Sequence, residues 1–252
     1  MTPITLDPIT VSPTKTSNSR GDDVLGIVGG LGPLASAEFL KTIYESSLRG
    51  REQEAPKVIM YSDPSFPDRT DALISGDYGE LLTRLVSILR GLSSLGATRT
   101  VVCCVTAHSL FSSLPADLRT QLVSLVDIIF EEIIQRPEKR LLICSKGTRE
   151  IGIFQAHEQW SATQEHIVLP DDGDQDLIHQ LIYQIKILRN VYELAPVFKS
   201  LLAKYRVSAF ISGCTEMHIV AKRLIFTNGD RSKSSCIDPL SIIAERIGVG
   251  TL

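Results

Sequence analysis

The sequence is first informative through what it lacks. Its 252 residues contain no run that approaches the roughly 20 apolar residues a membrane-spanning helix needs. Lysine and arginine gather in no segment, and the net charge is −3, which argues against nucleic acid as a partner. The single tryptophan, Trp160, is interpreted as a packing residue. At 43% hydrophobic content, the chain can bury a large core.

Cysteine chemistry is also limited. The five cysteines are an odd number and form no C-x-x-C pair, and no histidine–cysteine spacing is typical of zinc. The first residues lack the basic and apolar segments of a secretory signal. We therefore expect reduced thiols, no metal, no membrane partner and a cytoplasmic location.

The chain divides into an arm and an alternating region. Residues 1–22 are rich in Ser, Thr and Pro without apolar periodicity, which predicts a disordered arm. From Val24 onward, short apolar runs alternate with helical patterns. The expected strands are 24–28, 57–61, 140–144, 166–169 and 207–212, with another beginning at Arg99; the expected helices are 33–48, 80–95, 176–189 and 191–205.

This alternation predicts an α/β fold of parallel sheets flanked by helices. Because the second half repeats the order of the first, we expect two pseudo-symmetric lobes. Their expected boundaries are 23–119 with 230–252 for lobe 1, and 120–229 for lobe 2. Ligands of such sheets bind at the carboxyl ends of the strands, so the predicted site is the cleft between the lobes.

Two cysteines stand in matching settings at those strand ends. Cys104 follows the apolar run that starts at Arg99, and Cys214 follows the run 207–212. Each precedes a threonine where a helix is expected to begin. Backbone N–H groups at a helix start stabilise a thiolate, so the repeated arrangement indicates a pair of acid/base groups facing one substrate.

Five segments occur together in a known order. They are Gly29-Gly-Leu-Gly-Pro33, Pro67-Asp-Arg-Thr70, Cys104-Val-Thr-Ala-His108, Ile182-Tyr-Gln-Ile-Lys186 and Gly213-Cys-Thr-Glu216. From Val24 to the C-terminus the chain resembles the aspartate/glutamate racemase superfamily. It is most similar to the cofactor-independent aspartate racemases. The resemblance implies an amino-acid racemase that interconverts L- and D-aspartate and uses no cofactor, and we expect a homodimer.

Chemistry and resemblance agree on the two thiols. Racemisation without pyridoxal phosphate needs one base to remove the α-proton and one acid on the opposite face, and a thiolate and a thiol suit these roles. The enolate-like intermediate needs hydrogen-bond donors. Thr106, Thr148 and Thr215 lie at strand-to-helix turns and are candidate donors, although threonine there also caps helices.

Three charged residues complete the expected site. Arg69 is the candidate for a second substrate carboxylate, because a guanidinium binds carboxylate bidentately. Lys186 matches the second cationic contact that the resemblance implies, although from its own pattern it is a solvated helical lysine. Glu216 is the candidate for the substrate ammonium, or else a first-turn acid of the next helix.

Other features leave alternatives open. Val105 stands where the superfamily usually has Asn, and Asp63 stands at another such position. Gly30-Leu-Gly-Pro-Leu-Ala35 fits a dinucleotide pattern without its expected acid. His108 is interpreted as structural, with a hydrolase dyad as the alternative. The alternative functions are glutamate or hydantoin racemisation, maleate isomerisation, or a catalytically silent amino-acid-binding regulator.

Overall fold

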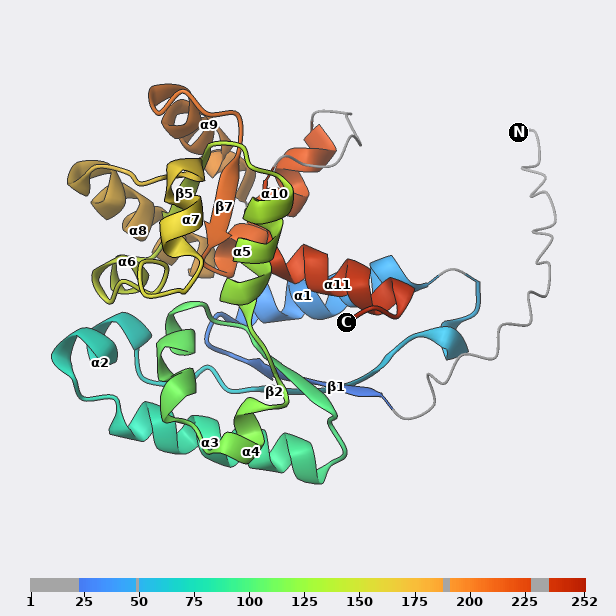
Figure 1. Ribbon diagram of the computed structural model, residues 1–252. Coiled ribbons are helices and arrows are strands. Elements are labelled where there is room, and N and C mark those ends of the chain that lie inside the picture. Colours follow the sequence, from blue (N-terminus) through green and yellow to red (C-terminus); the bar gives the residue numbers. More distant parts are fainter. Residues whose placement is uncertain (1–22, 49, 188–190, 228–235) are drawn as a thin grey trace, which may run out of the picture.

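The computed structural model describes residues 23–48, 50–187, 191–227 and 236–252 and shows two parallel sheets (Figure 1). The first has the order β2-β1-β3-β4 and the second β6-β5-β7. The strands are β1 (Val24–Gly29), β2 (Lys57–Ser62), β3 (Arg99–Val102), β4 (Leu122–Val123), β5 (Arg140–Cys144), β6 (Ile167–Val168) and β7 (Phe210–Gly213). The expected α/β fold of two parallel sheets is confirmed.

The helices complete both halves. The α-helices are α1 (Pro33–Ser47), α2 (Arg69–Ser75), α3 (Gly79–Ser94), α4 (Ala116–Arg119), α5 (Leu125–Gln135), α6 (Lys146–Glu150), α7 (Trp160–Thr163), α8 (Asp172–Ile187), α9 (Ala195–Lys204), α10 (Glu216–Thr227) and α11 (Pro239–Val249). The 3₁₀ helices are η1 (Glu52–Glu54), η2 (Thr106–Ser113), η3 (Gln164–His166) and η4 (Val191–Leu194).

The two sheets are built in the same order. In each, the first strand is central, the second is at one edge, and the third, which precedes a cysteine, pairs on the other side. The two sheets are also alike in the segment that pairs beyond the third strand. β4 pairs beyond β3 and leads into α5, while Ile237 makes a parallel bridge to Ile211 beyond β7 and leads into α11.

Helices α1 and α11 run side by side between the sheets (Figure 1), and α5 packs against α11. Gly248 of α11 allows this packing, because a Cβ there would lie 2.7 Å from the Ser46 carbonyl oxygen. One hydrophobic cluster contains residues of both sheets and of these three helices, including Ile27, Ile129 and Ile211. The lobes therefore share a continuous core.

Several boundaries differ from those expected. β7 begins at Phe210 rather than Val207, because the Val207 N–H closes the end of α9 by donating to the Leu202 carbonyl. Helix α8 begins at Asp172, and the Asp171 carboxylate accepts from the Asp174 N–H at 2.9 Å. Helix α2 lies in a segment for which no helix was expected.

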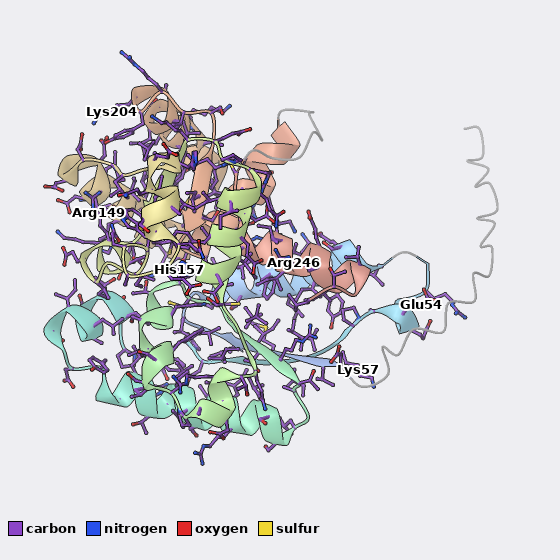
Figure 2. The ribbon with its side chains drawn as sticks, viewed as in Figure 1. Glu54, Lys57, Arg149, His157, Lys204 and Arg246 are labelled. Carbon is purple, nitrogen blue, oxygen red and sulfur yellow. The ribbon has the colours of Figure 1, made fainter. Side chains whose placement is uncertain are left out.

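The expected N-terminal arm and the expected lobe boundaries involve residues outside the described ranges. The expected disordered arm, residues 1–22, and part of the segment 230–252 lie outside the described residues, so the lobe boundaries stay a prediction. Charged side chains such as Lys204 lie on the outside, where Lys204 pairs with Asp171 and Asp174 (Figure 2). Within the described ranges, none of the helices has the length and apolar character to cross a bilayer.

Candidate active site

Cys104 lies just beyond the end of β3. The preceding Cys103 N–H still donates to the Val28 carbonyl at 2.9 Å, and η2 begins two residues later at Thr106. The two neighbouring thiols belong to different hydrophobic clusters. Cys103 is fully buried, and burial raises the pKa of its thiol, whereas Cys104 keeps 7% exposure. Cys104 is thus the thiol of this pair that faces the site.

Cys214 lies at the matching place after β7, with 8% exposure. Its thiol donates to Glu216 Oε2 at 2.9 Å. Burial raises the pKa of Cys214, and the charge of Glu216 and its hydrogen bond raise it further. The Thr215 hydroxyl donates to the Cys103 carbonyl at 3.3 Å, so the turns that carry the two cysteines are in contact.

Arg69 stands on the Cys104 side as the first residue of α2. Its guanidinium donates to the carbonyls of Leu31 and Pro67. Burial lowers the pKa of Arg69, but the charge and hydrogen bond of Cys104 and the charge of Asp68 outweigh burial and raise it. Its Nε is buried without a partner among the described residues. One N–H of the guanidinium therefore remains for an anion.

The two cysteines thus have opposite neighbours. The Arg69 guanidinium is a neighbour of Cys104, whereas the Glu216 carboxylate accepts a hydrogen bond from the Cys214 thiol. The charge of Cys104 also contributes to raising the pKa of Cys214, so the two groups act on each other.

The Glu216 carboxylate has one free oxygen. The side chain is 3% exposed, and its Oε1 has no partner among the described residues. A Cβ on Gly32 would lie 2.4 Å from this oxygen, so the glycine makes room for it. A buried carboxylate oxygen without a donor is costly unless a ligand supplies one. A cationic N–H donor would satisfy this oxygen.

Three hydroxyls meet where the lobes join. Thr106 Oγ1 lies 2.8 Å from Thr148 Oγ1 and 3.2 Å from Ser145 Oγ, and the last two are 3.0 Å apart. Ser145 also caps α6 by accepting from the Thr148 N–H. The structure thus brings two expected threonines together and adds Ser145, which the sequence analysis did not select although it lies in the same turn.

Lys186 lies on α8 with two partners that the sequence analysis missed. Its ammonium is 3.9 Å from the centre of the Tyr183 ring, and the Tyr183 hydroxyl donates to Asp68 Oδ2 at 2.6 Å. Asp68 also caps α2 by accepting from the Thr70 N–H. The charge of Lys186 partly offsets the rise in the pKa of Cys214 that burial and Glu216 cause. Both missed residues lie inside the motifs quoted above.

The glycine-rich loop after β1 packs closely against other residues of the chain. Gly30 has a φ of +88°, and a Cβ there would lie 2.3 Å from backbone atoms of Asp63. Asp63 is held by Ser65 and by Arg84 at 2.6 Å, and these bonds lower its pKa to about 2. Because Gly30 contacts Asp63 and Gly32 faces Glu216, the loop supports the site rather than a dinucleotide phosphate.

His108 and Val105 lie behind Cys104. The His108 Nδ1–H donates to the Cys104 carbonyl oxygen at 2.8 Å, and Nε2 accepts from the Leu125 N–H at 3.0 Å. Burial lowers the pKa of His108 to about 4. Both ring nitrogens are occupied by backbone groups, so His108 is structural and forms no dyad with the thiol. Val105 is buried in the core.

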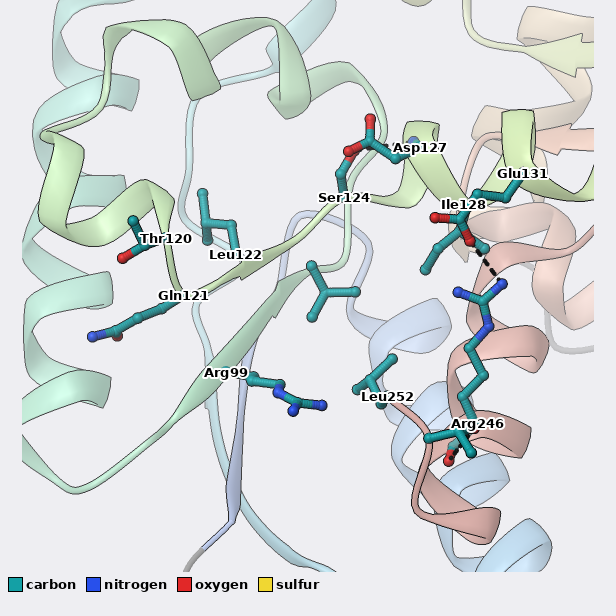
Figure 3. Close-up of a pocket in the computed structure, with 12 residues that line it drawn as sticks. Arg99, Thr120, Gln121, Leu122, Ser124, Asp127, Ile128, Glu131, Arg246 and Leu252 are labelled. Atoms are coloured by element: carbon teal, nitrogen blue, oxygen red, sulfur yellow. Dashed lines mark hydrogen bonds and ion pairs between the residues drawn. The ribbon is translucent and has the colours of Figure 1, made fainter. Parts of the chain in front are cut away.

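Two further findings concern other parts of the molecule. Among the described residues, no three His, Cys, Asp or Glu side chains are grouped as metal ligands. A cavity of about 300 Å³ is lined by residues of β4, α5 and α11 and by Arg99 (Figure 3). Arg99 is the first residue of β3, whereas Cys104 follows the last residue of β3. The cavity therefore lies at the opposite end of the strand from Cys104.

Comparison with known proteins gives a consistent result. Residues 28–247 match the family described as Asp/Glu/hydantoin racemase. The fold is similar to that of Picrophilus torridus aspartate racemase, with a TM-score of 0.73, 21% identity, and 91% of this chain and 94% of that chain covered. A putative Asp/Glu racemase from Yersinia pestis gives 0.66 and 21%, covering 91% and 99%. An aspartate racemase homologue from Pyrococcus horikoshii gives 0.60 and 21%, covering 91% and 99%.

Proposed function

Because the chain belongs to the Asp/Glu/hydantoin racemase family, we propose that it interconverts the enantiomers of an acidic amino acid, most readily aspartate, through Cys104 and Cys214. The racemase assignment made from the motifs is confirmed at the level of the family. The observation that carries the proposal is the opposite pairing of two equivalent cysteines, one with a cation and one with a carboxylate.

The reaction needs two proton transfers. In one direction the Cys104 thiolate takes the proton from Cα, and the electron pair of the C–H bond moves toward the α-carboxylate to give an enolate-like intermediate. The Cys214 thiol then gives its proton to the opposite face of Cα. The products are the other enantiomer, a Cys104 thiol and a Cys214 thiolate. The reverse direction uses the same groups with exchanged roles.

The surrounding residues bind and stabilise. Thr106, Ser145 and Thr148 supply hydroxyls toward the α-carboxylate, where charge develops in the intermediate. We assign to these hydroxyls the donor role that the superfamily's Asn would have at Val105. Thr215 holds the second cysteine turn against the first through the Cys103 carbonyl.

Charge selects the substrate. Glu216 Oε1 accepts from the substrate ammonium, and Arg69 Nε, with the Lys186 ammonium, receives the side-chain carboxylate. A substrate without that second carboxylate leaves a buried guanidinium N–H unpaired. The preference for aspartate over glutamate follows from the resemblance to aspartate racemases, since one methylene gives only about 1–3 kcal/mol of discrimination.

The test is solvent deuterium uptake at Cα in the presence of L- or D-aspartate, glutamate, alanine or a hydantoin, without added cofactor. Exchange together with loss of optical rotation of aspartate supports the proposal. Faster exchange of glutamate or of the hydantoin assigns another reaction of this scaffold. Binding of an amino acid by calorimetry without any exchange indicates the regulator and contradicts the proposal.

A further inference from the structure

A histidine follows each of the two cysteines at the same interval. His108 comes four residues after Cys104, and His218 comes four residues after Cys214. Both histidines are buried, with 7% and 0% exposure. Their ring nitrogens bond to groups other than the thiols, so the repeated spacing has no place in the proton transfers proposed above.

Both histidines reach the start of an equivalent helix. His108 Nε2 accepts from the N–H of Leu125, the first residue of α5. His218 Nδ1 lies 2.6 Å from Oδ2 of Asp238, the residue that precedes α11. As described above, α5 follows β4 and α11 follows Ile237, which pairs beyond β7 as β4 pairs beyond β3. The same joint is therefore built twice.

The second ring nitrogens complete the joints. His108 Nδ1 donates to the carbonyl oxygen of Cys104 itself. His218 Nε2 lies 2.9 Å from the Thr42 hydroxyl on α1, so His218 links α10, α11 and α1. Helix α1 also carries the loop whose Gly32 faces Glu216. The turn with Cys214 and Glu216 is thus held against α1 at two places, by Glu216 beside Gly32 and by His218 beside Thr42.

The Thr42–His218–Asp238 arrangement has the order of a hydrolytic triad, but its contacts argue against one. Thr42 is buried, and its hydroxyl accepts from the Lys222 ammonium at 2.8 Å while reaching the Glu38 carbonyl at 2.8 Å. Lys222 is itself paired with Glu38 and Glu45. A nucleophilic hydroxyl needs access to substrate, and this one is enclosed by helix and ammonium.

We infer that His108 and His218 are equivalent positioning residues, each of which ties the turn carrying its cysteine to the helix behind it and so holds that thiol on its own face of the substrate. The cysteines lie in short connections, Cys104 between β3 and η2 and Cys214 between β7 and α10. Proton transfer tolerates displacements of only about 0.5 Å, which a short connection alone does not guarantee. This inference rests on the proposed racemase function.

The test separates the two faces. Cys104→Ala and Cys214→Ala each leave one base, which exchanges the α-hydrogen of one enantiomer with solvent. We expect His218→Phe to slow exchange through Cys214 by about 10²-fold and exchange through Cys104 much less. His108→Phe should do the reverse, so each variant is the matched control of the other. Equal losses on both faces would contradict the inference.

Conservative variants distinguish positioning from bulk. Asparagine places an N–H near the position of Nδ1, so His108→Asn can still donate to the Cys104 carbonyl and His218→Asn to Asp238. Each should restore most of the lost exchange. If a phenylalanine variant does not fold, Asp238→Ala and Thr42→Val remove the partners of His218 instead, and the same face-specific loss is expected.

A second measurement does not depend on racemisation. Alkylation by iodoacetamide can be measured at each cysteine by peptide mass spectrometry. The ratio of alkylation at Cys214 to alkylation at Cys104 should rise in His218→Phe and fall in His108→Phe. His166→Gln, which replaces a histidine that lies 3.6 Å from the neighbouring Glu165, is the control. Unchanged ratios overturn the inference. If the ratios shift but the wild type exchanges no α-hydrogen, the positioning role of the histidines stands and the proposed racemase function is refuted.

Discussion

The Tyr183 hydroxyl donates a 2.6 Å hydrogen bond to the Asp68 carboxylate and thereby joins α8 of the second half to α2 of the first. Burial, the hydrogen bond to Asp68 and its charge raise the pKa of Tyr183, so the phenol remains a donor. Beside this bond, a Cβ on Gly147 of α6 would lie 2.7 Å from the Thr70 hydroxyl of α2. The two halves therefore pack closely where α2 meets α6 and α8.

This closure gives the first prediction. Tyr183→Phe removes the donor and leaves Asp68 as an N-cap, so we expect a loss of about 1 kcal/mol in the free energy of unfolding. Because α2 also carries Arg69, KM for aspartate should rise about ten-fold with a smaller change in kcat. Urea unfolding and steady-state kinetics measure both.

Asp68→Asn is the matched variant, since asparagine also caps helices and accepts from a phenol. It should keep the stability of the wild type while losing the charge that faces Arg69 and Lys186. If Tyr183→Phe and the wild type have the same KM, the bond between α2 and α8 has no part in substrate binding.

The second prediction concerns the two thiols. Cys104→Ala and Cys214→Ala should each lose several orders of magnitude of racemisation, while each still exchanges the α-hydrogen of one enantiomer, a different one in each variant. Both enantiomers have the same free energy in solution, so kcat/KM is equal in the two directions, and only exchange or isotope effects reveal which cysteine serves which face. Proton NMR of L- and D-aspartate in D₂O measures it.

Both variants should fold with little change in thermal unfolding, because alanine removes only a sulfur from a turn. Racemisation above a tenth of the wild-type rate in either folded variant would remove that cysteine from the mechanism.

How much of this was predictable depends on how local the signal is. Strands such as β1 and β5 are short apolar runs, and parallel strands buried on both faces are recognisable as such. The positions of Cys104 and Cys214 followed from two other such runs, which form β3 and β7. Helix α2 was missed because its seven residues directly follow a segment rich in Ser, Pro and Asp, and its N-cap Asp68 is evident only from the structure.

Contacts between distant segments were out of reach. Tyr183 is 115 residues from Asp68, and Thr42 is 176 residues from His218. A single sequence shows that such residues are polar or aromatic but not which partner each one finds. The equivalent spacing of His108 and His218 gained meaning only when β4 and Ile237 were seen at matching positions of the two sheets.

The third prediction is a pH dependence of stability. Burial lowers the pKa of His108 to about 4, while an unfolded histidine titrates near 6.5. Above pH 6.5 both states are neutral and the contribution is complete. As pH falls toward 4, only the unfolded state takes up the proton, so the free energy of unfolding decreases by about 3 kcal/mol in total.

His108→Asn has no titrating ring, so its free energy of unfolding should fall less steeply over this range. Asp238, whose pKa is lowered because the charge and bond of His218 outweigh burial, loses its contribution at lower pH in both proteins and cancels in the comparison. Urea unfolding at half-unit steps from pH 4 to 7 measures the slopes; parallel curves would show that His108 is not buried neutral.

The last prediction is that Arg69 sets the preference for diacids. Its Nε is a buried donor that has no partner in the part of the chain that the structure describes, and its other nitrogens donate to the Leu31 and Pro67 carbonyls, so the guanidinium is fixed before substrate arrives. Aspartate satisfies that donor, whereas alanine leaves it unpaired at a cost of about 1.4 kcal/mol or more, which is a factor of at least ten in kcat/KM. Arg69→Leu should raise KM for aspartate sharply and bring kcat/KM for aspartate and alanine closer together. Arg69→Lys keeps the charge without the fork and should fall between the two. Measuring kcat/KM for both substrates in all three proteins decides it: an unchanged aspartate-to-alanine ratio in Arg69→Leu would mean that the carboxylate is recognised by Lys186 or the hydroxyls instead.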